Sequence, residues 1–196
     1  MPSGIKASIK NTVDTSKIQK LARQAACLIL VGFPSGRMHV PTIHKDENGK
    51  YKGYNGEEVK DVQPIETAEL AKALSFGTST IPARPFLDEG IESQKDQLKK
   101  AMEKEAEKAI NGGKANWNKV GTMAVGAIQE FVRGDYYKST VPNSQRTIDY
   151  KGSDKPLIDG ADLINSLSFV VNGGDIQTSK GTMDNEAYNK ADFRSK

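Results

Sequence analysis

The feature that most constrains this fold is a pair of long amphipathic segments separated by a glycine stop. Apolar side chains recur at helical spacing on one face of the first segment, at Leu87, Ile91, Leu98, Met102, Ala106 and Ala109. The second segment, residues 115–133, has an apolar face formed by Trp117, Val120, Ala124, Ile128 and Phe131. Between them, Asn111-Gly112-Gly113 is a typical helix stop. The sequence therefore predicts one unbroken helix from Pro85 or Phe86 to about residue 110, and a second helix that returns beside it as a helical hairpin.

Two further features of the sequence concern this helical hairpin: the charges of its first helix and the glycines of its second. The first helix has opposite charges four residues apart in Asp96/Lys100 and Lys99/Glu103, which is typical of a solvated helix face. In the second helix, Gly121 and Gly126 each cost roughly 1 kcal/mol unless they allow close packing. The lysines of the first helix alternate with glutamates, so we expect weak, non-specific contact with DNA at most; they are Lys95, Lys99, Lys100, Lys104 and Lys108.

The remaining segments predict a small sheet beside the hairpin. Residues 27–33 are apolar and end at Pro34, which indicates a buried strand after a helix that begins near Thr15 or Ser16 and ends at about Ala26. "SLSFVV" at 166–171 indicates another strand. "PIETAELAKALSFGT" predicts a short helix that ends near Gly77, and "GADLINS" predicts another that Asp159 caps.

These elements define the expected architecture. We expect an α+β fold with a small antiparallel or mixed sheet packed against the helical hairpin, in a single domain that spans residues 1–172. Asn48-Gly49 is a hairpin signal within the polar stretch 34–63, which we expect to project as a loop or hairpin. Residues 173–196 have no sustained period and little apolar content, so we expect a C-terminal arm that becomes ordered on a neighbour.

The stretch "IPARPFLDEG" at 81–90 places Arg84 between two prolines, immediately before the first long helix. Pro85 disfavours a helical conformation at Arg84, and Pro82 fixes its own φ, so we expect a stiff, extended lead-in to that helix. Phe86 and Leu87 would then be buried and anchor it. For Arg84 two interpretations stay open: a docking residue, or a surface cation held by the lead-in.

Composition and spacing argue against several classes of chemistry. His39 and His44 are five residues apart, and together with one cysteine they make a poor metal set, so we interpret them as solvated loop histidines. No Ser/His/Asp arrangement is evident, and we expect no catalytic residues, no metal and no cofactor. The first ten residues do not form a signal peptide, and the longest apolar run is too short for a bilayer, so we expect no membrane association.

Two stretches together resemble a known family. "FGTSTIPARPFL" (76–87) is similar to a segment of the virion-morphogenesis proteins of long-tailed bacteriophages, and "KGSDKPLIDGADLINSLSFVV" (151–171) is similar to a later segment of the same family. The order and spacing of the two also match. The chain departs from the family pattern at Gly160-Ala161, where Thr-Gly is usual, and at Ser75, where an acidic residue is usual.

The resemblance implies a structural role in the virion neck, as a tail-completion or tail-terminator protein at the head–tail junction. It implies a ring, expected to be a hexamer, that contacts other neck proteins and the tail tube while DNA passes through its channel without specific binding. Such a protein would be made in the cytoplasm of the bacterial host. Candidate docking residues come from the two matching stretches: Ile81, Arg84, Phe86, Leu87, Leu157, Ile158 and Asp159.

Two other classes stay open. The sequence pI of about 8.8 and the "IDYK" at 148–151 are compatible with a DNA-binding or nuclease protein. A third possibility is an assembly chaperone that is absent from the finished virion. Closed rings need two different patches on each subunit, and the loop at 34–63 and the C-terminal arm are the candidates for them.

Overall fold

The computed structural model describes residues 16, 19, 26–39, 44–45, 48, 50–53, 56–58, 63–159, 162–172, 174–178 and 181–182. Its helices are α2 (Thr67–Phe76), α3 (Phe86–Ser93), α4 (Lys95–Ile110), α5 (Trp117–Arg133), α6 (Tyr136–Thr140), α7 (Gln145–Lys151) and α8 (Asp162–Asn165). Its strands are β1 (Ile29–Gly32), β2 (Met38–His39), β3 (His44–Lys45), β4 (Tyr51–Lys52), β5 (Ile65–Glu66), β6 (Ser168–Val171), β7 (Ile176–Thr178) and β8 (Gly181–Thr182). The fold is α+β, as predicted.

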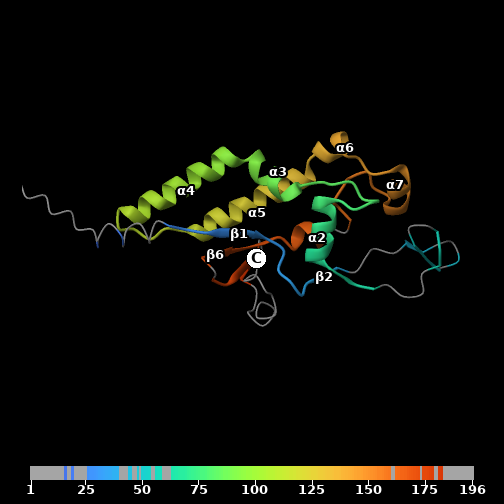
Figure 1. Ribbon diagram of the computed structural model, residues 1–196, viewed down its shortest axis with the longest axis horizontal. Helices are drawn as coiled ribbons and strands as arrows, with labels where there is room; N and C mark the ends of the chain where they lie inside the picture. The colour runs from blue at the N-terminus through green and yellow to red at the C-terminus, as the bar shows by residue number, and fades with distance from the viewer. Residues whose placement is uncertain are drawn as a thin grey trace, which may run out of the picture.

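Helix α5 is the centre of the molecule. One of its faces packs on β1 and β6, and the other packs on α3 and α4, so that α5 is the middle layer of the three (Figure 1). The side chain of Asn116 caps the helix by accepting the Lys119 N–H at 3.2 Å, and Gly134 follows its last turn. Its apolar face is buried almost completely because it meets both neighbouring layers.

The sheet is antiparallel in the described residues, with the strand order β1-β6-β7-β8. Strand β1 pairs with β6 in a register that places Ile29 opposite Val171 and Gly32 opposite Ser168. The predicted domain boundary at residue 172 is wrong. Strands β7 and β8, in the first part of the expected C-terminal arm, extend this sheet. A tight turn at Asn172 brings β7 back against β6, so backbone pairing stabilises a segment that has little apolar content of its own.

Two small antiparallel pairs lie in or beside the polar stretch 34–63. Strand β2 pairs with β5, and β3 pairs with β4 around the predicted Asn48-Gly49 turn. The β3–β4 pair is seen at the right of Figure 1, where it projects beyond α2. The expected projecting hairpin is therefore present, and one of its contacts to the domain is a 3.3 Å bond from the Tyr150 hydroxyl to the Lys52 carbonyl.

The predicted single helix 86–110 is broken in two at Gln94, which has φ −124° and ψ 24°. The hydroxyl of Ser93 donates to the Gly90 carbonyl at 2.7 Å, and the Gln94 amide donates to Glu130 on α5 at 2.6 Å. The Ser93 bond occupies a backbone carbonyl in the last turn of α3, and the Gln94 bond fastens the break to α5. The break leaves Met102, expected on the buried stripe, 41% exposed.

Most of the N-terminal helix expected before residue 26 lies outside the described residues, and so do Gly160, Ala161 and residues 183–196. Helix α8 is described from Asp162, and the two residues between it and Asp159, the predicted cap, lie outside the described residues. Among the described residues, no helix is both long enough and apolar enough to cross a membrane.

Candidate functional site

A cavity with a volume of about 740 Å³ lies beside helix α2. Helix α2, the segment 80–84, the α6–α7 connection, helix α7 and the segment 157–159 form its walls. Its lining runs from buried residues such as Leu157 to exposed ones such as Thr80, so the cavity opens to solvent. The apolar part of the wall includes Leu70, Leu74, Ile81, Pro82, Leu157 and Leu163. We call this cavity the docking pocket.

One wall of the docking pocket is the loop that connects α2 to α3. Gly77 ends α2 with φ +75°, and a Cβ there would lie 2.8 Å from the Ala83 nitrogen, so only glycine fits this close return of the chain. The Thr78 hydroxyl accepts the Ile81 N–H at 3.0 Å, and the Arg84 N–H donates to the Leu74 carbonyl at 2.9 Å. These bonds fasten the loop to the end of α2 and hold Ile81 and Arg84 in the wall.

Arg84 is buried, with 5% of its surface exposed, which overturns the interpretation of a surface cation. Its Nε donates to the Val141 carbonyl at 3.0 Å, and its Nη2 donates to the Pro142 carbonyl at 3.2 Å. The guanidinium therefore joins the loop before α3 to the connection between α6 and α7. Burial lowers the pKa of Arg84, but a guanidinium stays protonated in proteins, so the pocket holds a fixed positive charge.

Leu157 forms part of another wall and has an unusual backbone. Its φ of +61° lies in the left-handed region, which costs a residue with a Cβ about 1–2 kcal/mol, yet its side chain is buried. Such backbone conformations persist where the surroundings enforce them, and they are frequent at functional sites. The stretch 156–159 is therefore held with a strained backbone at Leu157, in the wall of the pocket.

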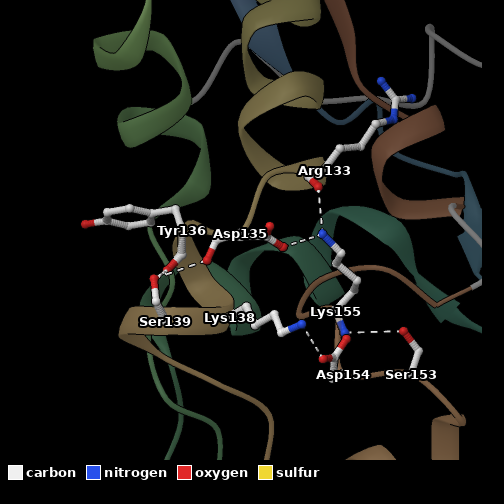
Figure 2. A network of polar contacts seen from close by, with 8 residues as sticks. All are labelled: Arg133, Asp135, Tyr136, Lys138, Ser139, Ser153, Asp154 and Lys155. Atoms are coloured by element: carbon white, nitrogen blue, oxygen red, sulfur yellow. Dashed lines mark hydrogen bonds and ion pairs between the residues drawn. The ribbon is translucent and has the colours of Figure 1, made fainter.

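The segment just before Leu157 is held by a network of ion pairs (Figure 2). The Lys138 ammonium lies 2.6 Å from an Asp154 carboxylate oxygen, and the Lys155 ammonium lies 2.5 Å from Asp135. Lys155 also donates to the Arg133 carbonyl at 3.3 Å, at the end of α5. The network ties residues 154–155 to the end of α5 and to α6, and it thereby supports the strained Leu157.

The second cation of the docking pocket is Lys151, on α7. Its ammonium donates to the Lys155 carbonyl at 2.7 Å. Burial lowers the pKa of Lys151, while the Asp159 carboxylate acts in the opposite direction and Arg84 adds to the lowering. Among the ion pairs in the described part of the chain, none involves Arg84 or Lys151. The pocket therefore holds two cations and one carboxylate, with no close pair among them.

Two further polar side chains of the pocket are buried without a full set of partners. His39 is buried, so its interpretation as a solvated loop histidine is wrong; strand pairing of β2 with β5 turns its ring inward. Its Nδ1 lies 3.5 Å from an Asp162 oxygen and makes no hydrogen bond to the described residues. The buried Nδ2 of Asn143 has no partner there either. Buried polar atoms of this kind are usually satisfied, so they indicate a site for a ligand group or water.

The structure divides the seven sequence-predicted docking residues into two groups. Ile81, Arg84, Leu157 and Asp159 line the docking pocket, although Arg84 and Leu157 are 73 residues apart in the chain. Phe86 is 0% exposed and packs edge-on against Phe33 in the core. Leu87 and Ile158 pack against the same core. Phe86 is therefore buried in the core, as expected for an anchor of the helix, and is not available to a neighbour.

The "IDYK" residues that suggested a nuclease lie on helix α7. Asp149 accepts a bond from Gln145 at 2.8 Å, and Lys151 is bonded to the Lys155 carbonyl, so each is engaged within or next to its own helix. Two residues apart on a helix do not face each other. Among the described residues, no group of three or more histidine, cysteine, aspartate or glutamate side chains is arranged to bind a metal ion.

Sequence reasoning did not identify His39, Asn143 and Lys151 as residues of this pocket. No local pattern identifies them, because they reach the pocket from β2, from the link between two short helices and from α7. Phe76, at the end of α2, is 78% exposed and does not line the pocket.

Comparison of the chain with models of protein families, with curated proteins and with solved structures finds no match in any of the three.

Proposed function

We propose that this protein is a structural subunit of a phage neck, where it forms a ring that joins the tail to the head connector around the DNA channel. The observation that carries the proposal is the docking pocket. Two stretches that resemble the virion-morphogenesis family, 76–87 and 151–171, meet in its walls through Ile81, Arg84, Leu157 and Asp159. A recognition cavity built from both stretches is what a subunit that binds neighbours requires.

The character of the pocket also supports a binding role. A cavity of about 740 Å³ falls in the range of ligand sites, and most of its lining is apolar with a few fixed polar groups. Arg84 uses two of its five side-chain N–H groups and Lys151 one of its three in bonds to backbone carbonyls, so both keep donors for a ligand. An apolar wall beside fixed charged groups suits the binding of a protein segment, because apolar contact supplies affinity and the charges select the partner.

The test is to find the protein in virions. Mass spectrometry of purified particles should detect this chain at a stoichiometry compatible with one ring for each particle, and electron microscopy with a labelled chain should localise it at the head–tail junction. An assembly chaperone would be needed for tailed particles to form but would be missing from the purified virion. A chain that is absent from virions, or spread over the capsid or tail, would contradict the proposal.

A further inference from the structure

The docking pocket has a charge that its own residues do not neutralise. Arg84 uses two of the five guanidinium N–H groups in the bonds to Val141 and Pro142. Lys151 is bonded to a backbone carbonyl, and Asp159 is the carboxylate in the lining. The buried Nδ2 of Asn143 adds a donor without a partner among the described residues. The polar part of the pocket therefore offers hydrogen-bond donors and positive charge, next to an apolar wall.

A ligand that matches this pocket carries carboxylates beside a large apolar group. The residues that follow β8 have this composition: residues 183–189 read "MDNEAYN", with two carboxylates, one tyrosine and no basic residue. In an extended segment, alternate side chains point to the same side. Asp184, Glu186 and Tyr188 would therefore face the pocket together, with the carboxylates toward the cations and the ring toward the apolar wall.

We propose that residues 184–188 of one copy dock in the pocket of a second copy, where Arg84 and Lys151 bind their carboxylates and the apolar wall receives Tyr188. The position of the end of β8 favours a contact between two copies over a contact within one chain. In Figure 1 strand β6, which pairs with β7, lies to the left of α2, and α7 lies farther to the right, beyond α2. Six residues of extended chain reach at most about 20 Å, which limits contact within one copy.

This inference deepens the proposed function, because a head-to-tail contact between identical subunits is what closes a ring. It can be tested separately from the proposed function, because it concerns the association of the purified chain and not the place of the chain in a particle. A chain that associates through the pocket but is missing from virions would contradict the proposed function alone. A virion protein whose association ignores the pocket would contradict this inference alone.

The first experiment measures association of the full-length chain by sedimentation velocity. The wild type should form oligomers, and a triple variant Asp184→Asn, Glu186→Gln and Tyr188→Ala should be monomeric at the same concentration. The changes lie after β8, so the thermal unfolding of the triple variant should match that of the wild type. A wild type and triple variant with the same oligomeric state would overturn the inference.

The second experiment adds a fluorescent peptide, MDNEAYN, to the full-length triple variant, whose own segment cannot compete. The peptide should bind, and a neutral peptide, MNNQAYN, should bind at least about tenfold more weakly because it lacks the carboxylates. Ile81 gives a matched pair in the pocket wall, since its backbone bonds to Thr78 survive substitution. Ile81→Asp should weaken peptide binding about tenfold more than Ile81→Asn, because only the aspartate repels the segment.

Two results decide against the inference. If the peptide does not bind, or if Ile81→Asp and Ile81→Asn behave alike, the pocket does not recognise this acidic segment. If the peptide binds the triple variant but the wild type is monomeric at every concentration, the segment docks within its own chain, and the contact between copies is wrong.

Discussion

Among single residues, Arg84 and Phe86 fix the conformation of the stretch that connects α2 to α3. They are two positions apart, yet Phe86 enters the apolar core against Phe33 and Arg84 reaches the carbonyls of Val141 and Pro142. The Phe86 N–H donates to the Arg84 carbonyl at 2.7 Å, which turns the chain sharply between the two. One short stretch therefore closes the core and one wall of the docking pocket at once.

Phe86→Ala should lower the free energy of unfolding by about 3–5 kcal/mol, because the ring is fully buried and its loss leaves a cavity. Arg84→Ala should lower it by about 2–4 kcal/mol, because two carbonyls lose a charged donor in a buried position. Arg84→Lys should be milder, since it keeps the charge but not the planar fork. Urea denaturation measures all three, and an Arg84→Ala protein as stable as the wild type would contradict the structural role of Arg84.

Glu105 is the buried acid of the hairpin, with 2% of its surface exposed. It accepts bonds from the Lys108 ammonium at 2.7 Å and from the Asn116 N–H at 2.8 Å, so it ties the last turns of α4 to the residue that caps α5. These two bonds lower the pKa of Glu105. The ionised form is therefore the one that the folded state stabilises.

Glu105→Gln should lower the melting temperature at neutral pH, and the difference from the wild type should shrink as the pH falls. A lowered folded-state pKa gives stability above the ordinary glutamate pKa of about 4.3 and loses it as the pH falls through the folded value. Asp135 and Asp154 also have a lowered pKa, because of Lys155 and Lys138, so both proteins lose stability in acid and only their difference reports Glu105.

Glu103→Gln is the control, because Glu103 is exposed and its oxygen lies 4.0 Å from Lys99. Its melting temperature should follow the wild type at every pH. Thermal unfolding from pH 7 to pH 3 gives the curves. A difference between wild type and Glu105→Gln that stays constant over this range would contradict the role of the ionised carboxylate.

At the scale of elements, the packing of α5 depends on two glycine contacts. Gly121 lies against the Phe169 ring of β6, where an added Cβ would be 2.1 Å from a ring carbon. On the other side, Gly90 of α3 lies against Ile128, where a Cβ would be 2.8 Å from the Ile128 Cα. The sheet and α3 therefore approach α5 closely on opposite faces, which explains why α5 keeps a glycine despite the cost to the helix.

Gly121→Ala and Gly126→Ala form a matched pair on this helix. Gly121→Ala should lower the free energy of unfolding by about 1–3 kcal/mol, because the methyl group overlaps the Phe169 ring and the layers must shift. Gly126→Ala should raise it by about 0.5–1 kcal/mol, because nothing lies within 4 Å and alanine is the better helix former. Chemical denaturation of both gives the test, and equal effects of the same sign would contradict the layer contact.

At the scale of the whole molecule, the outer helix α4 has mixed charge. Lys95 pairs with Glu92 at 2.8 Å, Lys99 lies 4.0 Å from Glu103, and Lys108 pairs with Glu105 at 2.7 Å. The whole chain has a formal net charge of only +3. Opposite charges therefore alternate along α4, whereas a nucleic-acid binder usually has a concentrated basic face.

We therefore expect DNA binding no tighter than about 1 µM at physiological salt, the tight end of ordinary non-specific binding. Fluorescence anisotropy with a labelled duplex at two salt concentrations measures it. Charge reversal of an exposed lysine on α4, Lys104→Glu, should have little effect on this weak binding. Sub-micromolar affinity that falls steeply with salt would favour the DNA-binding alternative instead.

The elements with local signals could be predicted from the sequence. Periodic apolar positions and the stops at Gly77 and Gly112 predicted α2, α5 and the end of α4, and the stretch 166–171 predicted β6. Only the tertiary structure decided the break at Gln94, the pairing of β7 and β8, the burial of Arg84 and His39, and the docking pocket. The physical reason is distance along the chain: a helix cap needs four residues, whereas Arg84 is buried because carbonyls 57 and 58 residues away accept its hydrogen bonds.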